Sequence, residues 1–357
     1  MLDAGRAGRQ VPLLLALVLV LAGCATATSP GTVAGPSSTS PSPTSPSPAS
    51  PSPASPSPTS TSSPVGERCN GIRYDDVLGP RPDLSGPPLR VTKVSRAICA
   101  GYWAPHLDDY FTPQSLEISG TTAYVGGYRW SRDVSTRPCQ IAVIDTRTGR
   151  TTAFVAKFQA PVYGPKPTYC RHAGGMELTR DGLWVAELQR LWLLDPAKLG
   201  KGDPVIRVWK LDRTVRGATV LVSGRRIGFG SFRAARPGKL VWFDLADVLA
   251  PRRTRLDRSF ADAVRRVPTR LQGITSTAGG LWATSSSSHC AELRAPGRGP
   301  VAFVHGAEDL EVVGRYLWTV SEAGVKAYLH GRDPIVPSLV RLDTAKVLAG
   351  KRHTCGW

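Results

Sequence analysis

The sequence predicts an all-β protein assembled from repeated four-stranded units. One pattern, first seen at 116–125, occurs five times along the chain. In each copy two apolar residues stand two places apart, and a second apolar run begins after a short polar turn. An apolar strand that ends in Asp then follows four of the copies. Short strands repeated in this way are typical of propeller blades. We therefore expect a β-propeller of five four-stranded blades, with six blades as the alternative.

The first two strands of each unit are predicted by the shared spacing. Each polar turn contains Gly, which is a hairpin signal when it lies in a short connection between strands. Tyr124, Trp184, Trp282 and Trp318 recur in the second strands, where we expect them to fill the space between blades rather than contact a ligand. The paired residues and the later runs are Leu116/Ile118 with 123–125, Met176/Leu178 with 183–185, Val220/Val222 with 227–229, Ile274/Ser276 with 281–283, and Leu310/Val312 with 317–319.

Third and fourth strands complete the units less regularly. The strands that end in Asp lie at 142–145, 192–195, 241–244 and 340–343, whereas the fourth unit offers only 290–293. Fourth strands are expected at 151–158, 205–211 and 301–305. In the third unit, 256–267 is predicted to be partly helical. Upstream, alternating apolar residues predict strands at 89–94 and, less regularly, 97–103.

The N-terminus has the features of an export signal. Arg6 and Arg9 precede an apolar run at 11–21, which is too short for a permanent transmembrane helix. The run ends in Leu-Ala-Gly-Cys at 21–24, which resembles a bacterial lipobox. That resemblance implies that 1–24 is a lipoprotein signal peptide and that Cys24 carries the lipid anchor, at the extracytoplasmic face of the cell membrane. The alternative is an ordinary signal peptide and a free secreted protein.

Three further segments are expected after the signal peptide. Residues 25–64 are almost wholly Ser, Thr, Pro, Ala and Gly, so they cannot bury a core and are predicted to form a disordered spacer. Residues 65–113 are irregular and are expected to supply closing strands. Residues 114–357 are expected to form the propeller.

Six cysteines remain beyond Cys24. Because an even number in an exported chain favours disulfides, we expect three. We predict one pairing, Cys139 with Cys170, because these two flank a repeat unit. The six candidates are Cys69, Cys99, Cys139, Cys170, Cys290 and Cys355.

The first repeat carries a family resemblance. Tyr124-Val-Gly-Gly-Tyr128, followed by the stretch 141–149, is similar to YVTN-type, NHL and SMP-30-like bacterial propeller repeats. The stretches 113–116 and 272–274 resemble the starts of such blades. The resemblance is close in the first unit and loose elsewhere. It implies a fold rather than an activity, because propellers host many functions.

The connections on one side of the predicted propeller vary in length and are rich in arginine. Variable loops on a rigid scaffold are where binding usually occurs, and a net charge of +18 attracts anions. We therefore consider an anion-binding rim, the alternative being solvated arginines from a GC-rich genome. Its members would be Arg129, Arg132, Arg233, Arg236, Arg252, Arg253, Arg265 and Arg266.

Polar residues at the starts of the first strands and the ends of two second strands should line the mouth of the central channel. They suit a small polar ligand or an ion, or they satisfy one another around a watery channel. These residues are Gln114, Ser115, His172, Arg216, Gln272, Glu308, Asp309 and Glu322.

The function expected from these features is binding or scaffolding at the bacterial envelope, without catalytic residues. We expect a monomer that is held at the membrane by its lipid and that binds an anionic cell-wall polymer or a small polar ligand, but no nucleic acid. The alternative is a metal-dependent hydrolase, because SMP-30-like lactonases use Glu, Asn and Asp ligands. The only Asn, Asn70, lies outside the repeats. We therefore expect no cofactor and no metal, calcium being the one alternative.

Overall fold

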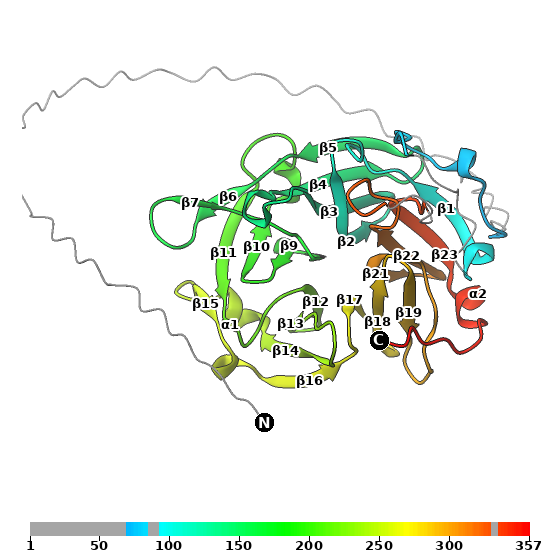
Figure 1. The fold of residues 1–357 in the computed structure, drawn as a ribbon. Coiled ribbons are helices and arrows are strands. Elements are labelled where there is room, and N and C mark those ends of the chain that lie inside the picture. Colours follow the sequence, from blue (N-terminus) through cyan, green and yellow to red (C-terminus); the bar gives the residue numbers. More distant parts are fainter. Residues whose placement is uncertain (1–68, 85–92, 330–334) are drawn as a thin grey trace, which may run out of the picture. The chain divides into compact units, whose positions relative to one another are not determined.

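The computed structural model describes residues 69–84, 93–329 and 335–357, which form a five-bladed β-propeller (Figure 1). The predicted signal peptide, lipobox and spacer, and most of the strand expected at 89–94, lie outside the described residues. Each blade holds four antiparallel strands, which follow one another along the chain in blades 1 to 4, whereas the outer strand of blade 5 is β1. The first strand of each meander lies innermost, and the five inner strands, β2, β8, β12, β17 and β21, surround the centre (Figure 1).

The strand bounds follow the repeats. Blade 1 contains β2 (Phe111–Ser119), β3 (Thr122–Arg129), β4 (Cys139–Asp145) and β5 (Arg150–Val155). Blade 2 contains β8 (Gly175–Thr179), β9 (Gly182–Glu187), β10 (Arg190–Leu194) and β11 (Val205–Leu211), and the two-residue β15 (Arg255–Leu256) adds to β11 in parallel. Blade 3 contains β12 (Thr219–Ser223), β13 (Arg226–Gly230), β14 (Gly238–Asp244) and β16 (Ala263–Val267).

The remaining strands complete the ring. Blade 4 contains β17 (Leu271–Thr277), β18 (Gly280–Ser287), β19 (Cys290–Arg294) and β20 (Val301–Ala302). Blade 5 contains β21 (Ala307–Val313), β22 (Tyr316–Ser321), β23 (Leu339–Asp343) and β1 (Ile98–Tyr102). A small hairpin of β6 (Gln159–Pro161) and β7 (Pro167–Tyr169) connects blades 1 and 2.

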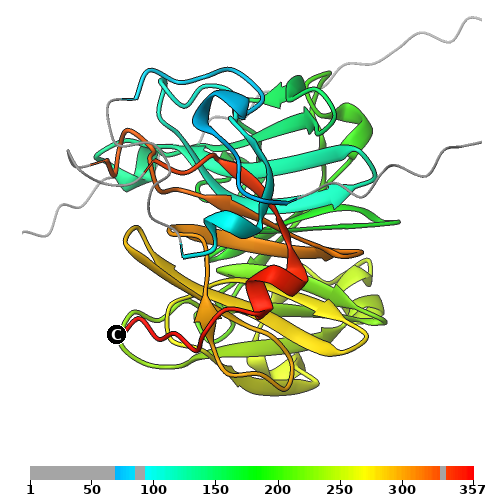
Figure 2. The same cartoon turned by 90° about the vertical axis from the view of Figure 1, so that its right-hand side faces the viewer.

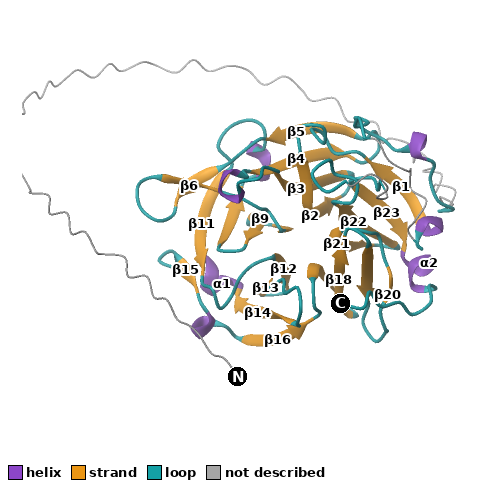
Figure 3. Ribbon diagram, viewed as in Figure 1, coloured by secondary structure: helices purple, strands orange, loops and turns teal. Residues whose placement is uncertain are grey.

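Helices are few and short in the described part of the chain. Two of them are α-helices, α1 (Leu245–Leu249) and α2 (Thr344–Leu348), and both lie outside the sheets (Figures 1 and 3). Single 3₁₀ turns occur at Tyr74–Asp76, Ser95–Ala97, Val134–Thr136, Pro196–Lys198 and Arg258–Phe260. No helix in the described ranges is long and apolar enough to cross a bilayer.

The ring is closed by a strand from the N-terminal side of the repeats. β1 pairs with β23 and supplies the outer strand of blade 5, so the first and last parts of the body share one sheet (Figure 2). Tyr102 of β1 is 1% exposed, stacks on Trp318 of blade 5 and donates a hydrogen bond to the carbonyl of Thr146 in blade 1 at 2.9 Å. One side chain therefore joins the last blade to the first.

Apolar side chains fill the spaces between neighbouring blades. Trp184 and Trp209 of blade 2 pack together with Phe229 and Phe243 of blade 3 in one cluster, for example. Trp184, Trp282 and Trp318 are nearly inaccessible to solvent, whereas Tyr124 is half-buried. The recurring aromatic residues thus pack between blades, as the sequence indicates.

The Asp residue that ends four of the third strands has a local role. Asp195 Oδ1 accepts a hydrogen bond from the Ala197 backbone N–H at 3.0 Å, and Asp244 Oδ1 accepts one from Ala246 at 2.8 Å. Asp145 and Asp343 do the same. A carboxylate that binds a free N–H two or three residues on fixes the turn that leaves the strand. The repeated Asp therefore shapes the fold and is not a ligand-binding signature.

Three disulfides connect loops and chain ends of the propeller. They join Cys69 to Cys99, Cys139 to Cys170, and Cys290 to Cys355. The expected number and the Cys139–Cys170 pairing are confirmed. In the third unit, the stretch 256–267 is helical only in the 3₁₀ turn at Arg258–Phe260, and 263–267 forms a regular outer strand.

Candidate functional site

The two faces of the propeller differ in the length of their connections. We call the face with the turns between first and second strands the hairpin face, and the opposite one the loop face. The turns on the hairpin face are only two residues long in every blade, such as Gly120-Thr121 between β2 and β3. On the loop face, the connections between second and third strands and between blades vary widely in length, as expected from the sequence.

The loop face also holds the backbone conformations that are costly for side-chain-bearing residues. All five described non-glycine residues with positive φ lie in segments that lead into inner strands: His106, Tyr110, Ala173, Arg216 and Arg270. Left-handed backbone is uncommon for such residues, and where it occurs it often marks functional segments. A left-handed residue fixes the direction in which the following strand starts. Arg216, with φ 48°, lies beside the cavities described next.

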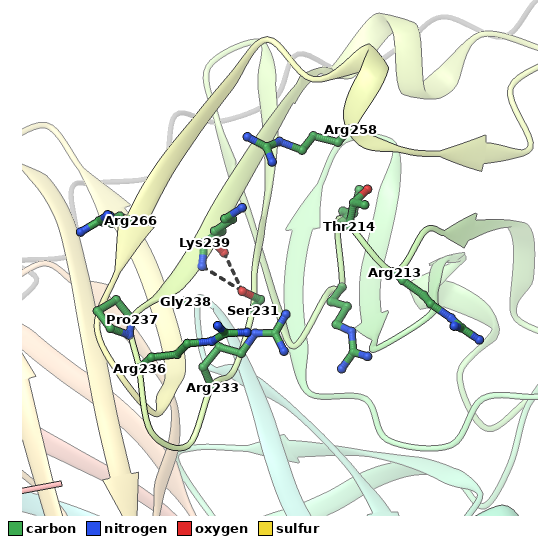
Figure 4. Close-up of a pocket in the computed structure, with 12 residues that line it drawn as sticks. Arg213, Thr214, Ser231, Arg233, Arg236, Pro237, Gly238, Lys239, Arg258 and Arg266 are labelled. Atoms are coloured by element: carbon green, nitrogen blue, oxygen red, sulfur yellow. Dashed lines mark hydrogen bonds between the residues drawn. The ribbon is translucent and has the colours of Figure 1, made fainter.

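The first cavity has a volume of about 510 Å³ and is strongly basic; we call it the arginine cavity (Figure 4). It lies between blades 2 and 3 on the loop face. Its charged lining comes from four segments: the connection from β11 to β12, the loop from β13 into β14, the 3₁₀ turn after β15, and β16. These residues are Arg213, Arg216, Arg233, Arg236, Lys239, Arg258 and Arg266.

The positive charge of the arginine cavity is not balanced by its surroundings. No Asp or Glu occurs among the residues that line it, and within the described ranges none of its seven cations forms an ion pair. Most of these side chains are exposed, so solvent screens the repulsion between them, and an anion in the cavity would be attracted by several of them at once. The arrangement therefore favours an anionic ligand.

A tight connection positions two of these arginines. Ser231 Oγ accepts a hydrogen bond from the Lys239 backbone N–H at 2.8 Å, which closes the loop that carries Arg233 and Arg236 (Figure 4). A Cβ on Gly238 would lie 2.1 Å from the Ser231 carbonyl oxygen, so only glycine permits this approach. The loop therefore holds both guanidinium groups over one rigid edge of blade 3.

A second cavity of about 350 Å³ adjoins the first, because Arg213 and Arg216 line both. Its lining mixes cations with apolar and neutral groups, so we call it the mixed cavity. Val134 and Leu188 contribute apolar surface and are 64% and 46% exposed. The other lining residues are Arg137, Arg171, His172, Glu187, Gln189 and Arg190.

The acidic group of the mixed cavity is already neutralised. Glu187 forms an ion pair with Arg190, and both side chains are only 3% exposed. Glu187 also accepts a hydrogen bond from the Arg171 backbone N–H. Burial lowers the pKa of Arg190 to about 10, which still leaves it charged at neutral pH. The cationic character of this cavity therefore comes from Arg171, Arg213 and Arg216, with Arg137 stacked over Tyr128.

Two polar atoms in the mixed cavity lack partners. Arg171 Nε and His172 Nδ1 are inaccessible to solvent and form no hydrogen bond among the described residues. Burial, with a smaller effect from Arg137, lowers the pKa of His172 to about 4, so the imidazole is neutral at physiological pH. A Cβ on Gly174 would lie 2.9 Å from His172 Nδ1, so this nitrogen packs against the backbone and does not face the cavity. The outer parts of the Arg171 and His172 side chains line the cavity and give it a polar wall.

The predicted channel-mouth residues divide into three groups in the structure. Gln114 Nε2 donates to Glu322 at 3.0 Å, and Gln272 Nε2 donates to Glu308 at 2.9 Å, while Glu308 and Glu322 share a hydrogen bond. These four form one chain across blades 1, 4 and 5. His172 and Arg216 instead line the mixed cavity.

Ser115 and Asp309 have structural partners. Ser115 Oγ donates to the Ala173 carbonyl at 2.7 Å, and Asp309 Oδ2 accepts from the Leu116 backbone N–H at 3.1 Å. A Cβ on Gly273 of β17 would lie 2.5 Å from the Asp309 Cα of β21, so glycine lets these two neighbouring inner strands approach each other. Both polar side chains join neighbouring blades.

Three inner-strand glutamates were missed by the sequence reasoning. Glu117, Glu177 and Glu311 stand between the two apolar residues of their repeats, so they point away from the core. Glu311 accepts from the Ile118 backbone N–H, Glu117 from Leu178 at 3.0 Å, and Glu177 from Val222. Each carboxyl group caps the unpaired edge of the next inner strand. The signal that could have found them is Glu at the same repeat position in three of five copies.

Burial raises the pKa values of these channel carboxyl groups. The pKa rises to about 9 for Glu117, about 8 for Glu177 and about 7 for Glu311. In Glu117 the charge of Glu311 adds to the effect of burial. Burial also raises the pKa of Glu322 to about 7, and those of Glu308 and Asp309 well above their ordinary values. The channel therefore carries less negative charge at neutral pH than its composition indicates.

The predicted basic rim is only partly assembled. Arg233, Arg236 and Arg266 line the arginine cavity. Arg129 pairs with Asp109 at 2.6 Å. Arg252 and Arg253 lie in a separate hollow with Asp257 and Phe260. Arg265 lies between blades 3 and 4 with Ser223 and Ser276, because adjacent residues on β16 point to opposite sides of the sheet. Arg132 belongs to neither cavity. Arg258 also belongs to the arginine cavity, as does Arg213, which the prediction omitted.

Comparisons with known proteins add little beyond the fold. No family model matches the chain, and no curated protein matches it. Among solved structures, BamB from Moraxella catarrhalis is 14% identical, over 64% of this chain and 58% of that chain, with a TM-score of 0.29. The Neurospora crassa Pan2 WD40 domain is 10% identical, over 68% and 67%, with a TM-score of 0.33. Sqt1 from Chaetomium thermophilum is 13% identical, over 72% and 74%, with a TM-score of 0.30. Their functions are not transferred to this chain.

Proposed function

We propose that this protein is a lipid-anchored, extracytoplasmic binding or scaffold protein that holds an anionic ligand on the loop face of its propeller. The observation that carries the proposal is the arginine cavity, with seven cations and no carboxylate in its lining. Arg presents a planar fork that matches the oxygen pairs of phosphate and carboxylate groups. Six of the seven cations are Arg, which favours recognition of such groups over simple charge attraction.

Two features support the proposed location. The stretch 21–24, Leu-Ala-Gly-Cys, follows an apolar run of signal-peptide length, which supports lipidation at Cys24. The three disulfides suit an oxidising compartment outside the cytoplasm. An acylated Cys24 followed by the spacer 25–64 would hold the propeller away from the membrane surface.

The proposed attachment is tested by Cys24→Ala in the full chain. The wild-type protein should fractionate with membranes and the variant with the soluble fraction. A variant that stays with membranes in the same proportion would contradict lipidation at Cys24 while leaving the anion site open to separate testing.

The proposed binding is tested by retention on isolated envelope material at increasing salt concentration. The paired variant Arg233→Glu/Arg236→Glu should elute at clearly lower salt than the wild type, because it reverses two charges in the arginine cavity. The matched control is Arg180→Glu/Arg225→Glu, which reverses two exposed charges on the hairpin face. Equal elution of both variants would show that net charge alone governs retention and would reject the site.

We propose this role without a metal or other cofactor. A metal-dependent hydrolase would need the channel carboxyl groups as ligands. Asp309 instead accepts backbone hydrogen bonds from Leu116 and Leu310, and Glu308 is hydrogen-bonded to Glu322 and Gln272. The test is thermal denaturation with millimolar calcium: we expect no change in the melting temperature, and a rise of several degrees would revive the hydrolase alternative.

A further inference from the structure

The arginine cavity and the mixed cavity share a wall, which bears on the length of the ligand. Arg213 and Arg216 come from the single connection between β11 and β12, and both line each cavity. The arginine cavity extends from there over blade 3, and the mixed cavity extends the other way over blade 2 and the loop that carries Val134. A molecule that occupies both cavities would cross between them over the side chains of Arg213 and Arg216.

The two cavities differ in chemistry, whereas a site for a small anion would need only a cationic lining. The arginine cavity offers only cations and small polar or neutral groups. The mixed cavity offers exposed apolar surface from Val134 and Leu188, the neutral imidazole of His172 and the side chain of Gln189. Such surface suits uncharged CH and hydroxyl groups, whereas Arg171, Arg213 and Arg216 remain available for anionic groups.

The number of arginines indicates which anion is suited. Six of the seven cations that line the arginine cavity are Arg, and several of them can contact one ligand at the same time. A phosphodiester group carries one negative charge shared by two oxygen atoms, which an Arg fork can bind as a pair. A chain that repeats this group places several such charges along the cavity.

From these observations we propose that the two cavities form one site for a linear phosphodiester polymer, in which phosphate groups alternate with uncharged polyol or sugar units. Phosphates occupy the arginine cavity and the Arg213–Arg216 wall, and an uncharged unit lies against His172 and Leu188. The inference deepens the proposed function and rests on it, because it names the ligand class of the same site.

The side chains of Arg171 and His172 supply polar groups to the mixed cavity, which both residues line. Their Nε and Nδ1 atoms are enclosed by protein, so a ligand would contact the outer parts of these side chains. A phosphate oxygen could accept from the terminal guanidinium nitrogens of Arg171. A ligand confined to the arginine cavity could not make this contact.

The experiment is calorimetric titration of the full chain with poly(glycerol phosphate), its two-phosphate fragment and inorganic polyphosphate of matched phosphate number. Poly(glycerol phosphate) should bind more tightly than its fragment. The gain in affinity should exceed the statistical gain that comes from the larger number of phosphate groups on the polymer. It should also bind more tightly than inorganic polyphosphate, although the latter has denser charge. Tighter binding of inorganic polyphosphate would reject the role of the uncharged units, and equal affinity of polymer and fragment would reject the joint site.

Matched substitutions localise the two halves. Arg233→Gln in the arginine cavity and Arg171→Gln in the mixed cavity should each weaken polymer binding roughly tenfold. Only Arg233→Gln should weaken binding of the two-phosphate fragment, while Arg180→Gln on the hairpin face should change neither. If Arg171→Gln leaves polymer binding unchanged, the mixed cavity does not take part. If none of the three anions binds in a salt-sensitive way, the proposed function itself fails, which is a different outcome.

Discussion

At the scale of single residues, the channel carboxyl groups and the arginines of the arginine cavity lie in different parts of the propeller. Carboxyl groups of Glu117, Glu177 and Glu311 lie on the inner strands, where each caps a backbone N–H of the next blade. Unpaired arginines lie on the loop face. Burial keeps several of these carboxyl groups partly protonated. The electrostatic attraction between the channel and the basic loop face is therefore weaker than it would be if all the carboxyl groups were charged.

The channel carboxyl groups make stability depend on pH. Burial raises the pKa of Glu117 to about 9, so the folded protein binds this proton more tightly than the unfolded chain does. The associated stability is fully present below the unfolded pKa of about 4.3 and is lost as pH rises through about 9. Glu117→Gln keeps an oxygen for the Leu178 N–H and carries no charge. We therefore expect it to melt higher than the wild type at pH 8, by roughly 2–4 °C, and equally at pH 4.

Melting curves by circular dichroism across this pH range check the prediction. The control is Asp203→Asn, which removes an exposed carboxylate and should leave the pH dependence unchanged. A loss of stability in Glu117→Gln at pH 8 would mean that the charged form of Glu117 stabilises the ring, contrary to the direction of its pKa shift.

Residue-level chemistry was the part of the site least accessible from sequence. The repeat pattern is defined by its apolar positions, so it predicts no role for the glutamates between them. The arginine-rich loops were recognised, but neighbouring residues such as Arg265 and Arg266 point to opposite sides of β16. Which arginines meet depends on the packing of blade 2 against blade 3, and no local pattern encodes it.

At the scale of elements, the repeat spacing was enough to predict the hairpins, because side-chain alternation and a glycine turn are local properties. The outer strand of blade 5 is not local. β1 lies more than two hundred residues before its partner β23 and shows only a short alternating pattern. Its pairing follows from closure of the ring, which removes one exposed edge.

Tyr102 gives a direct test of that closure. Tyr102→Ala should lower the free energy of unfolding by about 3–5 kcal/mol, because it removes a buried ring that stacks on Trp318. Tyr102→Phe removes only the hydrogen bond to Thr146 in blade 1 and should cost about 1 kcal/mol. Urea denaturation measures both values. Near-wild-type stability of Tyr102→Ala would show that the ring does not depend on β1.

The Cys139–Cys170 disulfide should hold the mixed cavity in place. Cys170 directly precedes Arg171 and His172, and its carbonyl accepts from the Cys139 N–H at 2.8 Å. Cys139→Ala/Cys170→Ala should lower the free energy of unfolding by about 3–4 kcal/mol. It should also weaken polymer binding while leaving binding of the two-phosphate fragment unchanged. Unfolding and titration experiments measure the two effects.

The matched control for that variant is Cys290→Ala/Cys355→Ala, which frees the C-terminal tail from β19 without touching either cavity. It should lose stability but keep its affinity for the polymer. Equal loss of affinity in both variants would indicate general loosening of the fold rather than local support of the mixed cavity.

At the scale of the whole molecule, the fold and the distinction between its two faces were predicted from sequence, because both follow from repeat number and loop length. The function follows less directly. A net charge of +18 fits many partners, and only the three-dimensional arrangement separates seven clustered cations from the other arginines. The cavity forms because blades 2 and 3 lie next to each other in the ring, so no single repeat predicts it.

The proposed ligand of the loop face is a phosphate-bearing polymer that binds around the arginine cavity. Hydrogen–deuterium exchange of the full chain with and without poly(glycerol phosphate) tests this proposal, because it locates the bound surface without any substitution. We predict slower exchange at 212–218 and 231–239, and no change in the hairpin-face turns at 119–122 and 223–226. Protection confined to the hairpin face, or no protection under conditions where the polymer is bound, would contradict the claim.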